Sequence, residues 1–329
     1  MHVLVTGASG FVGAALVPRL CSEGHSVRAF GRDEGRVRDA LADGGDANAA
    51  AAQVLCGDAL SGAGLSAALD GVEVAYYLIH SMERTIPHAL PFEQRERIAA
   101  SNFAAAAARA GVRRIVYLGG LLPRWGRTPH VGGNAAVSES PSSRHLASRE
   151  QVERILLDGV ADSLALRASI VIGARSRSFR LLVRLVERMP LLTLPSWQSY
   201  RTRPIDERDI VEMLTACATA RLPVRTLEVG GPDVLTYGEM LHRIADLMLV
   251  ARPSLALRVS MTPIAARVAA ALAGEDPELV LPLMEGLQGD LLPCDDNAAE
   301  LFGVRLHSFD SAVEHALAVW ERREPLAAR

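Results

Sequence analysis

The chain opens with the stretch His2-Val3-Leu4-Val5-Thr6-Gly7-Ala8-Ser9-Gly10-Phe11-Val12-Gly13. The residues from His2 to Thr6 form a short apolar run that ends at a glycine, a pattern typical of a buried strand. Apolar residues then recur at helical spacing from Phe11 to Cys21. The stretch therefore predicts a strand, a tight turn and a helix in immediate succession.

The alternation of strand and helix continues well beyond this stretch. Further strands are predicted at Ser26–Phe30, Gln53–Cys56, Glu73–Ile79, Arg113–Leu118 and Ser163–Ile172, and helices at Asp33–Ala42, Ala63–Leu69, Arg144–Leu157 and in a long segment ending at Gly111. Strands that alternate with helices indicate a parallel sheet joined by right-handed crossovers, with helices on both faces. We expect an α/β fold with a doubly wound parallel sheet of the Rossmann type.

The pattern changes after residue 174. A helix at Phe179–Arg188 is followed by a proline-rich segment from Pro190 to Pro204 and then by further helices to Trp320. We therefore expect a Rossmann domain at residues 1–174 and a smaller, mostly helical lobe at residues 175–329. The two are interleaved in this prediction, because sheet elements return at about residues 204–230.

The composition is that of an ordinary globular protein. Hydrophobic residues make up 49% and charged residues 22% of the 329 positions, and the net charge is −3. A charge this small gives no electrostatic footprint for nucleic acid or for an anionic membrane. The chain contains no lysine, so all 35 basic side chains are arginines and any mechanism that needs a lysine ammonium group is excluded.

The cysteines and the apolar segments indicate a cytoplasmic location. Cys21, Cys56, Cys217 and Cys294 lie far apart and form no C-x-x-C pair, so neither a metal site nor a redox dithiol is expected. The first strand starts at once, and no uninterrupted apolar run approaches about 18 residues. We therefore expect neither a signal peptide nor stable insertion into a membrane.

The glycines of the opening stretch indicate a phosphate-binding turn. Glycine at these positions lets backbone N–H groups and the N-terminus of the following helix approach a pyrophosphate closely. The alternative, a simple turn, does not need the strand and helix on either side. We predict a dinucleotide cofactor bound by the following residues: Thr6, Gly7, Ser9, Gly10, Phe11, Val12 and Gly13.

The residue after the second strand indicates which dinucleotide is bound. In such folds an acid at this point accepts hydrogen bonds from the ribose hydroxyls of NAD(H). This chain has Arg32, a planar cation suited to a 2′-phosphate, and Asp33 follows it directly. We favour NADP(H) and keep NAD(H) as the alternative; in the other interpretation Arg32 is a solvated surface residue.

Two more side chains follow strands of the predicted sheet. Asp58 comes after the third strand, where it either contacts the adenine or caps a helix. His80 comes after the fourth strand, at the carboxyl edge where ligands of open α/β folds bind. His80 is therefore a candidate catalytic residue, with an ordinary loop histidine as the other interpretation.

The chain resembles the extended and atypical short-chain dehydrogenase/reductases over most of its length to about residue 250. The resemblance rests on T-G-x-x-G-x-x-G at Thr6–Gly13, Gly57-Asp58, Asn102, Gly111–Leu118, Leu166-Arg167-Ala168 with Gly173, Pro204–Ile210 and Gly230–Glu239. It is most similar to the atypical branch that includes complex I accessory subunits and proteins similar to nucleoside-diphosphate-sugar epimerases.

The chain departs from that family where the family's chemistry lies. The resemblance implies a Tyr-x-x-x-Lys pair on the helix after the fifth strand and a serine at the end of that strand. This sequence has His145 and Arg149 at the same four-residue spacing, and Gly119-Gly120 in place of the serine. His145 and Arg149 share one helical face, but the phenol and the ammonium group are both missing.

These replacements leave two functions open. Arg149 is suited to hold the ribose hydroxyls or a phosphate of the cofactor, and His145 is suited to exchange a proton with a carbonyl or alkoxide. The first hypothesis is an NADP(H)-dependent oxidoreductase acting on an apolar or aromatic carbonyl compound. The rival is a non-catalytic protein that binds the cofactor as a structural element or redox sensor, with a protein partner. A sugar-nucleotide epimerase is disfavoured because its chemistry relies on the missing tyrosine.

Overall fold

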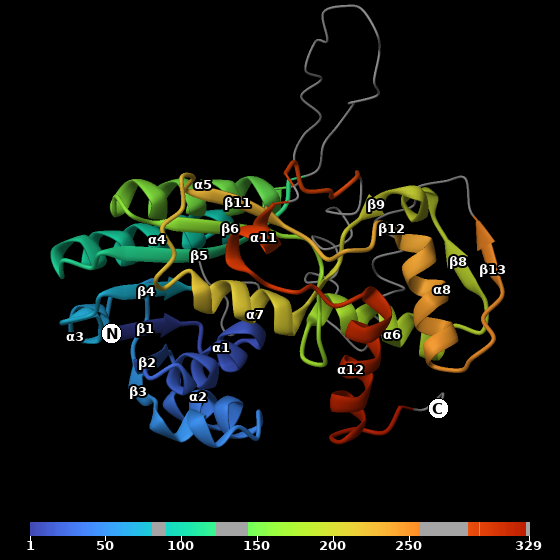
Figure 1. Cartoon of the computed structure of the whole chain (residues 1–329), viewed down its shortest axis with the longest axis horizontal. Coiled ribbons are helices and arrows are strands. Elements are labelled where there is room, and N and C mark those ends of the chain that lie inside the picture. The colour runs from blue at the N-terminus through green and yellow to red at the C-terminus, as the bar shows by residue number, and fades with distance from the viewer. Residues whose placement is uncertain (81–89, 123–143, 257–288, 296, 327–329) are drawn as a thin grey trace, which may run out of the picture.

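The computed structural model describes residues 1–80, 90–122, 144–256, 289–295 and 297–326, and Figure 1 gives its layout. Its central sheet contains β1 (His2–Thr6), β2 (Ser26–Gly31), β3 (Gln53–Cys56), β4 (Val74–Tyr77), β5 (Arg114–Gly120), β6 (Leu164–Ala168) and β11 (Thr226–Val229). The seven strands are parallel and run in the order β3-β2-β1-β4-β5-β6-β11. The order reverses between β1 and β4, which places a binding crevice at the carboxyl edge there.

Helices cover both faces of this sheet (Figure 1). They are α1 (Phe11–Ser22), α2 (Glu34–Ala42), α3 (Leu65–Leu69), α4 (Phe92–Arg109), α5 (Arg144–Gly159) and α7 (Glu207–Ala216), with a short 3-10 turn η1 at Ala47–Ala51. Val3 and Val5 of β1 belong to the core formed with α1 and α7, whereas Leu4 belongs to the core formed with α4 and α5. This alternation is what a strand buried on both faces requires.

A second lobe is built on its own core. Its helices α6 (Arg177–Arg188), α8 (Tyr237–Leu247) and α12 (Phe309–Glu321) bury apolar side chains that include Phe179, Leu241 and Trp320. Three short strand pairs complete it, β7 (Val171–Ile172) with β10 (Ile205–Asp206), β9 (Arg201–Thr202) with β12 (Leu235–Thr236), and β8 (Leu192–Leu194) with β13 (Ser254–Ala256). The remaining elements in the part of the chain that the structure describes are η2 (Ser196–Ser199) and α11 (Ala298–Phe302).

The predicted α/β class with a doubly wound parallel sheet and a smaller C-terminal lobe is confirmed. One predicted strand, Ser163–Ile172, is wrong as a single element, because the structure divides it into β6 and β7. The hydroxyl of Ser169 between them contacts the hydroxyl of Thr202, and β7 pairs with β10 rather than with β11. The chain therefore leaves the main sheet at this point and enters the second lobe.

The main sheet is also tied to the segment that returns to it. Arg114, at the start of β5, is 2% exposed, and its guanidinium donates to the carboxylate of Asp162 and to the carbonyl oxygens of Cys217 and Ala220. A buried guanidinium needs such acceptors to offset its desolvation.

Among the described helices none is long and apolar enough to cross a membrane.

Candidate active site

The glycine-rich loop joins β1 to α1 in a conformation that only glycine accommodates. Gly7 has a φ of +69°, and a Cβ there would lie 2.6 Å from the carbonyl oxygen of Leu78. A Cβ on Gly13 would overlap the carbonyl oxygen of Gly7, so the first turn of α1 packs directly against the loop. Gly10 caps α1 without any side-chain hydrogen bond. The first-turn N–H groups therefore remain available to an anion.

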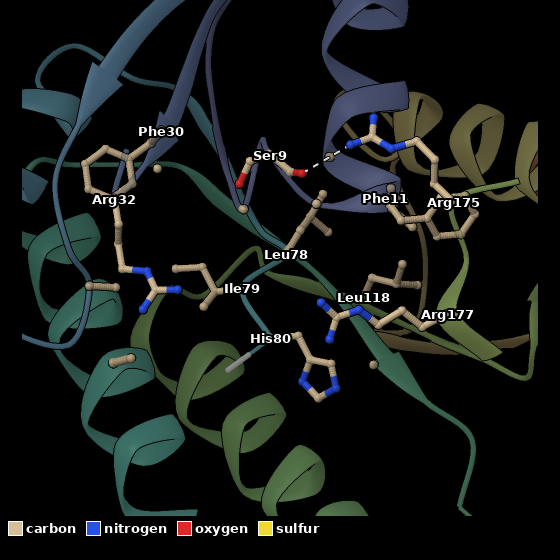
Figure 2. Close-up of a pocket in the computed structure, with 18 of the residues that line it drawn as sticks. Ser9, Phe11, Phe30, Arg32, Leu78, Ile79, His80, Leu118, Arg175 and Arg177 are labelled. Carbon is tan, nitrogen blue, oxygen red and sulfur yellow. Dashed lines mark hydrogen bonds between the residues drawn. The ribbon is translucent and has the colours of Figure 1, made fainter. Parts of the chain in front are cut away.

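A cavity of about 700 Å³ runs along the carboxyl edge of the sheet beside this loop. Most of the predicted site residues line it: Gly7, Ser9, Gly10, Phe11, Val12, Gly13, Arg32, Asp58, His80 and Arg149. Figure 2 shows Arg32 and Arg177 on opposite sides of this cavity, with Ser9 on the side of the loop and His80 across from it. A cavity of this size and shape is typical of a site for a small molecule or cofactor.

Thr6 is the one residue of the predicted loop set that does not line the cavity. Its side chain is fully buried, and its hydroxyl donates to the carbonyl oxygen of Tyr76 at 2.9 Å. Thr6 therefore ties β1 to β4 behind the cavity.

Two arginines stand at the end of β2. Arg32 directly follows the strand, Arg36 lies in the first turn of α2, and both line the cavity. The carboxylate of Asp33 accepts a hydrogen bond from the backbone N–H of Arg36 at 3.0 Å and so caps α2. Asp33, the acid next to Arg32 in the sequence, therefore acts as the N-cap of α2. Arg36 was missed, although an arginine three residues after a capping acid points to the same helix end.

Asp58 and Asn102 shape the loop after β3. The carboxylate of Asp58 accepts hydrogen bonds from the backbone N–H groups of Leu60 at 3.0 Å and Ser61 at 3.4 Å, which holds a turn at the cavity wall. The side-chain amide of Asn102, on α4, donates to the carbonyl oxygens of Ala59 at 3.1 Å and Leu60 at 2.9 Å. Asn102 therefore positions this loop from behind.

His80, Arg149 and Glu96 meet at the other end of the cavity. Arg149 Nη1 lies 3.3 Å from His80 Nδ1, and Arg149 Nη2 donates to the carbonyl oxygen of Leu118 at 2.7 Å. Glu96 Oε2 lies 4.0 Å from both His80 Nδ1 and Arg149 Nη1. The three residues come from the end of β4, from α5 and from α4, so the fold alone brings them together.

Tyr117 is packed beneath Arg149 and does not line the cavity. The Arg149 guanidinium lies 5.2 Å from the centre of the Tyr117 ring, and the Tyr117 hydroxyl donates to the backbone carbonyl of Arg149 at 3.3 Å. Burial raises the pKa of Tyr117 to about 12. The phenol is therefore a structural support for the arginine.

His145 belongs to the first turn of α5, but its side chain lies outside the part of the chain that the structure describes. Two cavity residues that sequence reasoning missed come from the chain after β7. Arg175 donates to the carbonyl oxygen of Ser9 at 3.4 Å and to that of Ala40 at 3.1 Å, and Arg177 lines the cavity nearby. No local motif marks either residue, because the second lobe brings them to the sheet edge.

Comparison with known proteins agrees with this geometry. Residues 7–159 match the model of the NAD(P)H-binding family. The matched residues include the glycine-rich loop, His80, Glu96 and Arg149. A 3β-hydroxysteroid dehydrogenase/Δ5→4-isomerase of Mycobacterium tuberculosis is 31% identical over 166 residues, which are 47% of this chain. The chain spans only 42% of the length of that relative.

Solved structures show the same fold over nearly the whole chain. A UDP-glucose 4-epimerase of Thermotoga maritima superposes with a TM-score of 0.72 at 13% identity, covering 98% of this chain and 99% of that one. A UDP-glucuronic acid 4-epimerase of Bacillus cereus, solved with UDP-glucuronic acid and NAD, has a TM-score of 0.68 at 16% identity, covering 98% of this chain and 100% of the other. At these identities the likeness is one of fold, and the substrates of those enzymes are not transferred to this protein.

Proposed function

We propose that this protein is an NADP(H)-dependent oxidoreductase that acts on an apolar or aromatic carbonyl compound. The observation that carries the proposal is one continuous cavity. It extends from the N-terminus of α1 and the arginines after β2 to His80, which follows β4, and to Arg149 on α5. A dinucleotide has phosphates for the first two features and a reactive ring for the last.

The residues fit the cofactor group by group. The loop from Gly7 to Gly13 would hold the pyrophosphate through its backbone N–H groups, and Arg32 and Arg36 would hold a 2′-phosphate. Arg149 would orient the nicotinamide end, with its guanidinium fixed by the carbonyl of Leu118. When bound, the nicotinamide group supplies or accepts a hydride.

The substrate class rests on the apolar part of the cavity lining. Leu118, Val171 and Leu181 line the cavity and offer apolar contacts to a substrate. The relative from Mycobacterium tuberculosis is named for action on a hydroxysteroid, a largely apolar alcohol, which supports the same class here. His80 would exchange a proton with the substrate oxygen, and His145 remains the second candidate for this role.

The rival function is a non-catalytic NAD(P)(H)-binding protein that serves as a structural element or redox sensor for a protein partner. The observation in its favour is the pair Gly119-Gly120 and Arg149 where reductases have a serine and a lysine. Under this hypothesis the cofactor binds, and no carbonyl compound is reduced.

One set of measurements separates these functions. The dissociation constants of NADPH and NADH are measured by fluorescence, and nicotinamide absorbance is then followed with a panel of ketones, enones, quinones and hydroxysteroids. We expect tighter binding of NADPH and turnover of at least one apolar compound. Tight binding without turnover would support the rival, and binding of neither cofactor would contradict both.

A further inference from the structure

Glu96 is a charged residue on the apolar side of a helix. In α4 it stands at helical spacing between Phe92 and Ala100, and its side chain is 0% exposed. A carboxylate removed from water is costly unless charged or hydrogen-bonding groups surround it. Its oxygen Oε2 lies 4.0 Å from two such groups, the Nη1 atom of Arg149 and the Nδ1 atom of His80.

The contact between Arg149 and His80 suits only one protonation state of the ring. A guanidinium has donors and no acceptor, so His80 Nδ1 must accept where Arg149 Nη1 approaches it at 3.3 Å. The ring is then neutral. A histidine that gives a proton to a substrate must first carry protons on both nitrogens, and in that state Nδ1–H needs an acceptor instead of a donor.

Glu96 places a carboxylate on that side of the ring. We propose that Glu96 is a positioning residue for His80, because its buried carboxylate, 4.0 Å from Nδ1, stabilises the charged ring on that side and leaves Nε2–H to protonate the substrate oxygen. This inference rests on the proposed function and names the proton donor within it. Glu96 itself does not line the cavity and touches no substrate.

The proton step is balanced within these groups. The N–H bond at His80 Nε2 breaks, its electron pair stays on the ring, and an O–H bond forms on the substrate oxygen as its carbonyl is reduced by the nicotinamide cofactor. The ring ends neutral, with its remaining proton on Nδ1 facing Glu96. Water then returns a proton to Nε2 through the cavity, since His80 remains 34% exposed.

The charged groups around His80 determine whether its ring can carry a proton on both nitrogens, and Glu96 favours this state. Arg149 approaches the ring from α5, and Phe92 of α4 packs edge-on against it at 6.4 Å between ring centres. The charge of Arg149 opposes a positive charge on His80. Among the described groups that contact the ring, Glu96 is the anion that offsets this arginine.

The test follows the titration of His80 in the cofactor-free protein by NMR. The signal of His80 is the one of nine histidine signals that disappears in His80→Gln. In Glu96→Gln, a substitution of nearly equal shape, we expect the His80 midpoint to fall by about one pH unit. Glu96→Asp keeps the negative charge but moves it away from His80, because the side chain is one methylene shorter. The His80 midpoint in Glu96→Asp should therefore lie between those of the wild type and Glu96→Gln.

Glu93→Gln is the matched control, because it removes a carboxylate from the same helix outside the cavity. It should leave the His80 midpoint within about 0.2 units. An unchanged midpoint in folded Glu96→Gln would overturn the inference. If that variant does not fold, Glu96→Asp decides alone, and a midpoint equal to that of the wild type would overturn it.

Activity measurements separate this inference from the proposed function. With a substrate in hand, kcat of Glu96→Gln should fall about tenfold at pH 7 with little change in KM, its pH profile should move to lower pH, and Glu96→Asp should restore part of kcat. If the wild type turns nothing over, the proposed function fails while the NMR result still decides whether Glu96 governs His80.

Discussion

The two ends of the cavity are built in opposite ways. At the glycine end, Gly7 to Gly13 are consecutive in sequence and offer backbone groups to a ligand. At the histidine end, side chains from three separate elements meet: His80 and Arg149 line the cavity, and Glu96 lies 4.0 Å from both. Local sequence therefore specifies the first end, whereas the tertiary fold assembles the second. The first end is suited to bind, and the second to direct chemistry.

The largest effect that would sharpen this contrast is expected at the histidine end. His80→Gln should lower kcat by about 100-fold or more, because a general acid contributes this much, while the dissociation constant of NADPH changes less than about twofold. Steady-state kinetics and fluorescence titration measure the two quantities.

His145→Gln is the matched variant on α5. We expect a much smaller loss of kcat from it than from His80→Gln. A large loss of kcat in His145→Gln together with a normal kcat in His80→Gln would identify His145 as the proton donor. The proton donor would then come from α5 and not from the end of β4.

At the glycine end, Arg32→Asp should show the opposite separation. NADPH binding should weaken by about 10- to 100-fold, because a charge-assisted contact to the 2′-phosphate is replaced by repulsion, whereas NADH binding should change little. Fluorescence titration with both cofactors measures the ratio. Equal losses for NADPH and NADH would remove Arg32 from a phosphate site and reopen the NAD(H) alternative.

A smaller effect is expected from the loop itself. In Gly13→Ala the new Cβ overlaps the carbonyl oxygen of Gly7, so the loop must shift. Binding of NADPH and NADH should weaken together by about tenfold, or 1.4 kcal/mol. Gly35→Ala is the control, since its Cβ would meet only Asp33 Oδ1 at 3.3 Å. Unchanged affinity in Gly13→Ala would show that the ligand does not depend on this loop geometry.

The smallest effect concerns pH and stability. Glu207 lies behind the glycine end, where it and the Phe11 ring both pack against Gly173. Burial, with a contribution from Asp206, raises the pKa of Glu207 to about 7. The unfolded chain loses this proton at lower pH, so the group's contribution to stability falls as pH rises from about 4.5 to about 7.

Glu207→Gln should therefore stabilise the protein at pH 8 by about 1–2 kcal/mol more than it does at pH 5. Urea unfolding at the two pH values measures the difference. Glu300→Gln, on the exposed side of α11, should show no such dependence. A Glu207→Gln effect that is equal at both pH values would contradict a raised pKa for Glu207.

The accuracy of the sequence predictions follows the same division between local and assembled features. The first five strands and the helices that follow them are set by short apolar runs and helical spacing, which need no knowledge of the rest of the fold. The division of Ser163–Ile172 depends on Thr202 and β10, which lie far along the chain. No property of that run signals the break.

One residue of the site, Glu96, could have been found from the sequence because it is a charged residue at an apolar position of a helix. Glu96 occupies the apolar face of α4, and a carboxylate at such a position signals a buried partner. Its partners His80 and Arg149 were both singled out from the sequence, but their meeting depends on the packing of α4 and α5 at the sheet edge. Arg175 and Arg177 required the placement of the second lobe, which local spacing does not give.

The position of β11 limits where this protein can be truncated. Thr226–Val229 forms the outermost strand beside β6, yet the ribosome delivers it only after α6 and α7. A fragment ending near residue 174 would expose the whole backbone edge of β6, a surface prone to pairing with other chains. Truncation at this boundary should therefore yield aggregates, while a fragment that runs through Val229 keeps β6 paired with β11.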